Sequence, residues 1–264
     1  MCVFTDAVQH VSDTRIFARV AGERQILVYE MTYAAESELA MVLPLPVPPR
    51  SAEDAVHFMS LEECPDFFTH LHNGYRPDTH GNTPFLSIGE AAGLDLDRTL
   101  EVVEVGSFEA SFVPRPEDFA KLDERFRLPA DLWLQLNFYA DWGFAVFKLN
   151  PTQRNRRVHP MAFDFPRRDR NRLFFPTLHI HHRSVDAAAD FDHALYCQPE
   201  PAMNWHLLSW QESYTAIKNY MPCKEPLALF DADFPVWRLR LEGTLENADT
   251  WLGRGGRIPA RLST

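Results

Sequence analysis

A cysteine at position 2, directly after the initiator methionine, is the residue best placed to do covalent chemistry. Methionine is normally removed before so small a residue, so we expect the mature chain to begin with the thiol and α-amine of Cys2. A thiolate is a nucleophile and a neutral amine is a base, so one residue could supply both parts of a catalyst. An adjacent cation lowers the pKa of a thiol, and Arg19 is the candidate for that role. The alternatives are a small buried apolar residue at position 2 and an ordinary surface charge at position 19.

Histidines form the second chemical feature of the sequence. His179 and His181 alternate along a predicted strand, so their side chains share one face about 7 Å apart. Two imidazoles placed in this way can bind zinc or another divalent transition metal. His193 and Cys197 follow shortly and could complete the ligand set. The alternative is that these histidines lie at an exposed strand end or bond to the backbone.

Seven arginines lie between residues 154 and 172. Guanidinium groups bind carboxylate and phosphate groups through paired hydrogen bonds, so this run could dock a substrate anion. The alternative is a solvated pair of loops whose arginines are neutralised by nearby Asp and Glu. The sequence leaves both interpretations open.

Composition narrows the class of protein. The chain has 264 residues, of which 45% are hydrophobic and 24% charged, which is typical of a globular protein. Its net charge of −11 argues against a general nucleic-acid binder, and the absence of an apolar run near 18 residues argues against a membrane span. Four cysteines (2, 64, 197 and 223) are far apart, and no secretion signal is evident. We therefore expect reduced thiols and a cytoplasmic protein. If the chain is an enzyme, we expect it to act on a small-molecule or peptide substrate.

The local patterns predict more strands than helices. Residues 15–32 form a hairpin with a turn at Gly22, and residues 143–149 form a buried strand. Prolines at 44, 46, 48 and 49 predict an extended segment that cannot be a central strand of a sheet. Residues 75–98 predict a long surface loop. Ser209 and Glu212 form a capping-box pattern, which predicts a helix over 209–220.

These elements predict the fold class. No regular alternation of strands and helices is present, so we expect an α+β protein with a largely antiparallel sheet and packed helices. The domain prediction is one domain over 1–264, or two closely packed halves that meet near 99–130.

Two resemblances can be stated on these residues. The start of the chain, with Cys2 and a hairpin carrying Arg19, resembles that of N-terminal-nucleophile hydrolases, which imply a stacked α/β sandwich and amide cleavage. Val3 replaces the glycine that follows the cysteine in glutamine amidotransferases. More of the chain resembles a bacterial family without an assigned function, through Cys2, the element Leu43-Pro44-Leu45-Pro46 and the segment His159-Pro160-Met161. This second resemblance implies a bacterial origin and supplies no activity.

Three functions follow as hypotheses. The first is an amidase or related acyl-transfer enzyme that uses Cys2 and Arg19. The second is a metal-binding enzyme or sensor that uses His179, His181, His193 and Cys197. The third is a non-catalytic binding or scaffold protein.

Overall fold

The predicted hairpin is the central element of the fold. It consists of β2 (His10–Ala21) and β3 (Arg24–Ala35), which pair antiparallel over most of their length. Gly22 has a φ of 60°, a left-handed conformation that glycine adopts without steric cost. The structure, a computed structural model, describes residues 2–6, 8–75, 103–105, 108–180, 184–223 and 229–261, with the side chains of a few of them left out. All of the predicted loop at 75–98 except Tyr75 therefore lies outside the described residues.

Strands dominate the described residues. They are β1 (Cys2–Phe4), β2, β3, β4 (Leu39–Leu45), β5 (His57–Met59), β6 (Val103–Val105), β7 (Phe108–Val113), β8 (Gly143–Leu149), β9 (Thr152–Arg157), β10 (Met161–Pro166), β11 (Arg172–Phe175), β12 (His179–Ile180), β13 (Ala188–Gln198), β14 (Gln211–Glu212), β15 (Trp237–Glu246) and β16 (Thr250–Gly253). The helices are α1 (Phe67–Asn73) and α2 (Ala130–Gln135), with short 3-10 helices at Pro116–Lys121, Glu124–Phe126, Asn137–Tyr139, Pro201–His206 and Ile217–Asn219. The protein is thus richer in β-structure than a balanced α+β fold. None of the helices in these ranges is long and apolar enough to cross a membrane.

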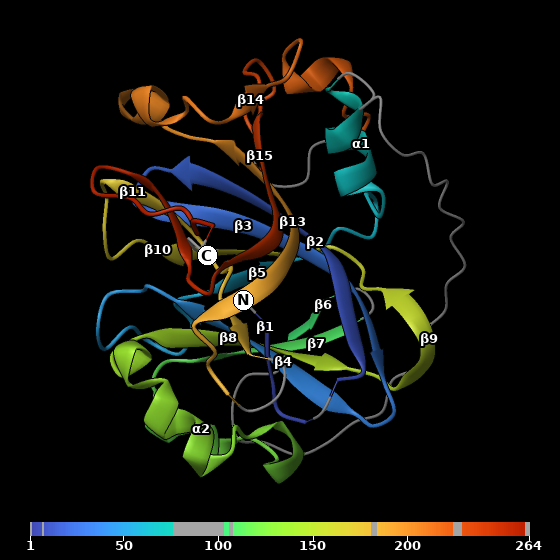
Figure 1. Ribbon diagram of the computed structural model, residues 1–264, viewed down its shortest axis with the longest axis vertical. Coiled ribbons are helices and arrows are strands. Elements are labelled where there is room, and N and C mark those ends of the chain that lie inside the picture. The colour runs from blue at the N-terminus through green and yellow to red at the C-terminus, as the bar shows by residue number, and fades with distance from the viewer. Residues whose placement is uncertain are drawn as a thin grey trace.

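Two larger sheets face each other (Figure 1). One has the strand order β12-β1-β4-β8-β7-β6, and the other has the order β14-β15-β13-β2-β3-β10-β5 with β9 paired to β3. A small third sheet joins β11 to β16. The pairs β1–β12 and β2–β13 are parallel and the remaining pairs are antiparallel, so the predicted antiparallel character is confirmed.

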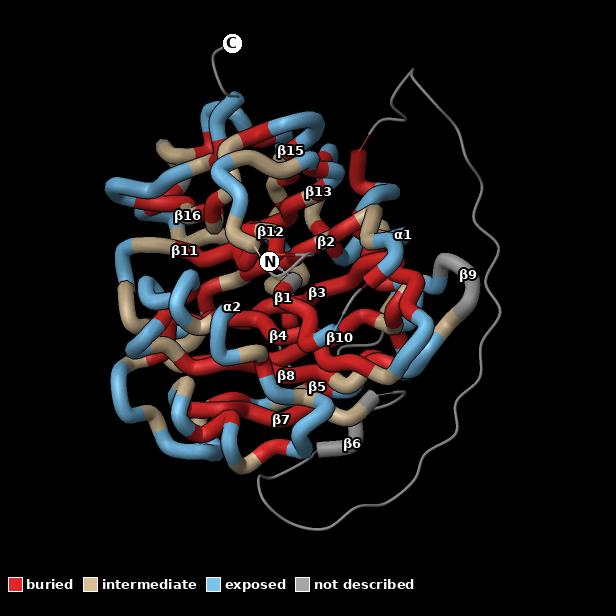
Figure 2. Tube along the Cα trace, turned by 60° about the horizontal axis from the view of Figure 1, so that its bottom comes forward, coloured by how far each residue is buried: buried red, intermediate tan, exposed pale blue. Residues whose placement is uncertain are grey.

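The alternation of side chains along β3 explains the layers. Leu27, Tyr29 and Met31 lie in the core that also contains Met41 and Phe147 of the facing sheet. Figure 2 shows the buried strands at the centre and exposed chain around them. The opposite side of each sheet is covered by a small helix.

Each helix has its own core cluster on the outer face of a sheet. On the eight-stranded sheet, α1 contributes Phe67 and Phe68, which pack with Val28. On the six-stranded sheet, α2 contributes Leu132, which packs with Val146. The order of layers is therefore helix, sheet, sheet, helix.

Two element predictions are wrong. The helix over 209–220 is replaced by β14 and a short 3-10 helix, because Ser213 donates its amide to the carbonyl of Val236 (2.8 Å) and accepts the Val236 amide through its hydroxyl (3.0 Å). Pro44 lies inside β4, a central strand. The sheet tolerates it because β1 reaches only Met41 and Val42 of β4, so Pro44 needs a neighbour only on β8.

A disulfide joins Cys64 to Cys223, with 5.5 Å between the two Cα atoms. The prediction of four reduced thiols is therefore wrong for this pair. The two cysteines are 159 positions apart in the sequence, so only the tertiary fold brings them together. The predicted single domain over 1–264, or two halves meeting near 99–130, stays a prediction.

Candidate functional site

The N-terminal strand brings the two chemical features of the sequence into one place. β1 lies between β12 and β4, and Cys2 is the direct register partner of His179 in the parallel β1–β12 pair. Val3 pairs on its other side with Val42. The side chain of Cys2 lies outside the described part of the structure. The backbone alone places the predicted nucleophile next to the predicted metal ligand.

His179 meets a second histidine from the other large sheet. Its Nε2 atom lies 3.2 Å from Nε2 of His193 on β13, and the ring centroids are 4.7 Å apart. At this distance one ring donates and the other accepts, so at least one imidazole presents an unprotonated nitrogen. Phe191, two residues before His193 on the same face, places its ring 4.4 Å from that of His179. The pair therefore links β12, at the edge of one sheet, to β13, an interior strand of the other.

Asn247 fixes β12 from the side. Its Oδ1 atom accepts the amide of His179 (2.7 Å), and its Nδ2 atom donates to the carbonyl of His179 (2.9 Å) and to that of Asp186 (2.9 Å). One side chain thus makes the two hydrogen bonds that a neighbouring strand would make. This explains why so short a strand holds its position.

Asp249 binds the backbone of the two residues that precede β12. Its Oδ1 atom accepts the amides of Thr177 (3.0 Å) and Leu178 (3.1 Å), and its Oδ2 atom accepts the hydroxyl of Tyr139. Burial raises the pKa of the Asp249 carboxyl and that of the Tyr139 hydroxyl. The strand that carries His179 is thereby held by partly buried polar side chains from the C-terminal part of the chain.

A polar hollow of about 380 Å³ opens beside this strand. We call it the N-terminal cleft, and its polar lining residues include His179, Asp186, Asp190, Asp192, His193 and Asn247. Burial raises the pKa of the Asp192 carboxyl, and its Oδ2 atom accepts the amide of Asp13 at 2.5 Å. Its lining includes three carboxyl groups and two imidazoles, so the cleft favours hydrogen-bond donors and cations over anions.

The other predicted site residues lie elsewhere. Arg19 is on β2 of the other sheet, with its guanidinium 4.0 Å from the carboxylate of Asp231, so the structure does not bring it to Cys2. Cys197 is fully buried in the core between the sheets, and burial raises the pKa of its thiol. His181 lies outside the described residues.

The metal-binding prediction is therefore corrected. Among the described ranges, no group of three or more His, Cys, Asp or Glu side chains is arranged to hold a metal ion. Of the three predicted ligands that the structure describes, His179 and His193 meet and Cys197 lies apart from them. Cys197 lies four residues beyond His193 on β13, which is about 13 Å along a strand. Two imidazoles alone fall short of the four ligands of a structural zinc site and of the three protein ligands of a catalytic one.

Most of the arginine run between 154 and 172 is neutralised locally. Arg167 is buried and donates to the carbonyls of Gly22 (3.3 Å) and Arg170 (2.5 Å). The carboxylate partners of the next three are Asp141 for Arg168, Glu23 for Arg170 and Asp169 for Arg172. The interpretation as loops with local ion pairs holds for this part of the run. Arg156 is an exception, and sequence reasoning had not separated it from its neighbours.

No protein-family model matches the chain, and no curated protein sequence is significantly similar to it. Its fold is similar to the crystal structure of baculovirus P35, with a TM-score of 0.50 and 13% identity, over 96% of this chain and 99% of P35. A mutated P35 after caspase cleavage matches with a TM-score of 0.47 and 13% identity, over 92% and 99% of the two chains. P35 in complex with caspase-8 matches with a TM-score of 0.42 and 12% identity, over 92% and 96%. Of these three structures, the first is similar enough to show the fold.

The likeness to P35 overturns the amidase hypothesis. The fold of this chain is similar to that of baculovirus P35, whereas the resemblance to N-terminal-nucleophile hydrolases implies a stacked α/β sandwich. It also conflicts with the expectations of a bacterial hydrolase and of a metal-binding protein. Cys2 does open a strand, as the resemblance to those hydrolases implies, but the fold around that strand is that of P35.

Proposed function

We propose that this chain is a non-catalytic protein that binds a caspase-type cysteine protease. The observation that carries the proposal is the likeness to baculovirus P35 over nearly the full length of both chains. P35 has been crystallised with caspase-8 and, in mutated form, after caspase cleavage. Of the three hypotheses drawn from the sequence, this proposal develops the non-catalytic binding protein.

The architecture suits a binder of this kind. A protein that occupies a protease must hold its contact residues on a rigid support, because ordering them upon binding reduces the affinity. The two facing sheets supply that support, with Tyr29, Phe147 and Phe163 fully buried between them. Their rigidity lets surface segments be presented with little loss of conformational entropy.

One flank of the segment 76–102 is firmly anchored. Tyr75 is buried, its hydroxyl donates to the carbonyl of Val236 (2.8 Å), and the guanidinium of Arg238 lies 4.3 Å from its ring centroid. The segment itself lies outside the described residues. Because the sequence predicts a long surface loop over 75–98 and such loops are preferred sites of proteolysis, we propose this segment as the first place to search for a caspase cut.

The test combines inhibition with binding. Purified chain is added to caspase-8, and hydrolysis of a fluorogenic peptide is followed while the mixture is separated by size. We expect a dose-dependent loss of activity and co-elution of the two proteins. Mass spectrometry of the recovered chain shows whether and where it is cut.

Two controls give the result its meaning. Heat-denatured chain should be digested without inhibiting, because inhibition requires the fold. A protease of another mechanism, such as a serine protease, should keep its activity. If the folded chain neither slows caspase-8 nor elutes with it, and other caspases behave in the same way, the proposal is wrong.

A further inference from the structure

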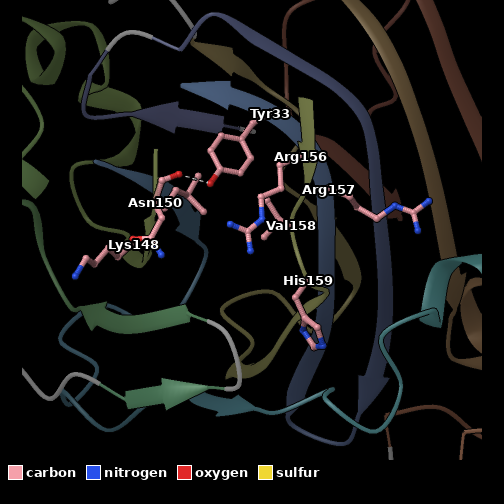
Figure 3. Close-up of a pocket in the computed structure, with 8 residues that line it drawn as sticks. Tyr33, Lys148, Asn150, Arg156, Arg157, Val158 and His159 are labelled. Atoms are coloured by element: carbon pink, nitrogen blue, oxygen red, sulfur yellow. Dashed lines mark hydrogen bonds between the residues drawn. The ribbon is translucent and has the colours of Figure 1, made fainter. Parts of the chain in front are cut away.

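A small hollow at one end of the space between the two sheets carries positive charge in an otherwise acidic protein. We call it the basic notch; it is lined by Tyr33, Lys148, Asn150, Arg156, Arg157 and His159, among others (Figure 3). Its volume is about 30 Å³. Sites for whole small molecules have volumes of hundreds of Å³, so this notch has room for a single functional group.

Strand register decides which arginine faces the notch. Tyr33 of β3 is opposite Arg156 of β9, and Thr32 is opposite Arg157. Directly opposed residues share a face of the sheet, so Arg156 lies on the side of Tyr33 and Arg157 on the other side. Figure 3 shows Arg156 extending towards the side of Tyr33 and Asn150, while Arg157 points away. The hydroxyl of Tyr33 donates to the carbonyl of Asn150 (2.6 Å), and this hydrogen bond joins two of the residues that line the notch.

The other basic residues around the notch are already neutralised. Lys148 donates to Glu109 at 3.0 Å, and Arg157 lies 3.7 Å from the buried Glu30. Burial lowers the pKa of His159, so its ring adds no charge near pH 7. Arg156 therefore supplies the charge that remains available.

Arg156 is exposed and has no carboxylate or hydrogen-bond acceptor within bonding distance among the described residues. Its charge is felt by Tyr33, whose pKa is raised by burial and lowered in part by this guanidinium. A guanidinium group with its donors unused beside a preformed hollow matches the planar geometry of a carboxylate. The net charge of −11 makes such a group a distinctive contact on this surface.

We propose that the basic notch receives an acidic side chain of the protease partner, paired with Arg156. This inference rests on the proposed function. An isolated small anion would gain little from one exposed guanidinium, because solvent screens an exposed ion pair. A carboxylate carried by a protein partner is held by the rest of the interface and excluded from water, where the same pair contributes more.

The experiment compares two charge reversals. Arg156→Glu and the control Arg254→Glu change the net charge equally, and Arg254 is likewise exposed but lies at the turn after β16. We expect the inhibition constant for caspase-8 to rise at least tenfold for Arg156→Glu and less than twofold for Arg254→Glu. The dependence on NaCl between 50 and 300 mM should be steep for the unmodified chain and flatter for Arg156→Glu.

The outcomes separate the two proposals. If the unmodified chain does not inhibit, the proposed function fails and this inference fails with it. If the chain inhibits and Arg156→Glu inhibits equally well, only the basic notch is wrongly assigned. If inorganic phosphate alters the NMR signals of Arg156 while the substitution leaves inhibition unchanged, the notch binds a small oxyanion and the docking proposal is overturned. Equal thermal midpoints for both variants show that folding is not the cause.

Discussion

The N-terminal cleft and the basic notch lie at different places along the two facing sheets and use polar residues in opposite ways. Beside the cleft, Asn247 and Asp249 are turned inward and hold backbone groups of residues 177–179. At the notch, Arg156 is exposed and has no hydrogen-bond or carboxylate partner among the described residues. The first arrangement fixes a strand, and the second leaves a charge accessible to another molecule.

This difference gives a way to distinguish structural from binding residues. When a side chain that accepts hydrogen bonds inside the protein is removed, its donors are left without a partner, and the free energy of unfolding falls by the cost of their desolvation. Substitution of such a side chain should therefore mainly affect folding. An exposed charge loses almost nothing in the free protein, so its substitution should mainly affect a complex. Three predictions test this contrast, in order of expected effect.

Replacing Asp249 with alanine should produce the largest loss of stability. The change leaves the amides of Thr177 and Leu178 and the hydroxyl of Tyr139 without their acceptor. We expect the free energy of unfolding to fall by roughly 3–5 kcal/mol, measured by urea denaturation. Asp249→Asn keeps an oxygen for both amides and should cost about 1–2 kcal/mol. Equal losses for the two variants would contradict the role assigned to these hydrogen bonds.

Glu30 of β3, whose carboxylate lies 3.7 Å from Arg157, should make the free energy of unfolding depend on pH. Burial raises its pKa from 4.5 to about 7, although Arg157 and Arg15 favour the charged form. The guanidinium of Arg15 lies closer to Asp13 (2.5 Å) than to Glu30 (3.3 Å), so it compensates Glu30 only in part. Between pH 4.5 and 7 the native state binds the proton and the unfolded state does not. Stability from this group is therefore lost as pH rises through that window, by about 3 kcal/mol in total.

Glu30→Gln is the matched variant for this effect. Near pH 4.5 it should be about as stable as the unmodified protein, because both side chains are neutral. Above pH 7 it should be the more stable of the two. Parallel stability curves from pH 4 to 8 would show that Glu30 is charged throughout and that the arginines outweigh burial.

The smallest effects are expected at the notch itself. Tyr33→Phe removes the hydrogen bond to the carbonyl of Asn150 and should cost about 1 kcal/mol. Arg156→Ala should change the free energy of unfolding by less than about 0.5 kcal/mol. Chemical denaturation of both variants checks this order. A loss above 2 kcal/mol for Arg156→Ala would mean that the side chain is structural, and the contrast with Asp249 would no longer hold.

The sequence predicted those strands whose residue types and turns are set by their immediate neighbours along the chain. The hairpin of β2 and β3 follows from two β-rich runs around Gly22, and residues 143–149 coincide with β8. The failed helix at 209–220 shows the limit, because the bonds between Ser213 and Val236 join positions 23 residues apart and outweigh the capping pattern.

The candidate site depended even more on distant contacts. The sequence predicted that His179 acts with His181 and His193 as metal ligands, and strand alternation paired it first with His181. The partner observed is His193, which belongs to another sheet, and its proximity follows from how the sheets meet. The position of Cys2 beside His179 likewise follows from a parallel pairing of strands almost 180 residues apart. Arg156 differs from the other arginines whose side chains the structure describes in this run because those have carboxylate partners.

The disulfide has a topological consequence for any encounter with a protease. Cys64 precedes the segment 76–102 and Cys223 follows it, so every peptide bond between them lies inside a covalent loop. One cut in that loop opens the ring without releasing a fragment. The two pieces would migrate as a single species under non-reducing electrophoresis and separate only after reduction.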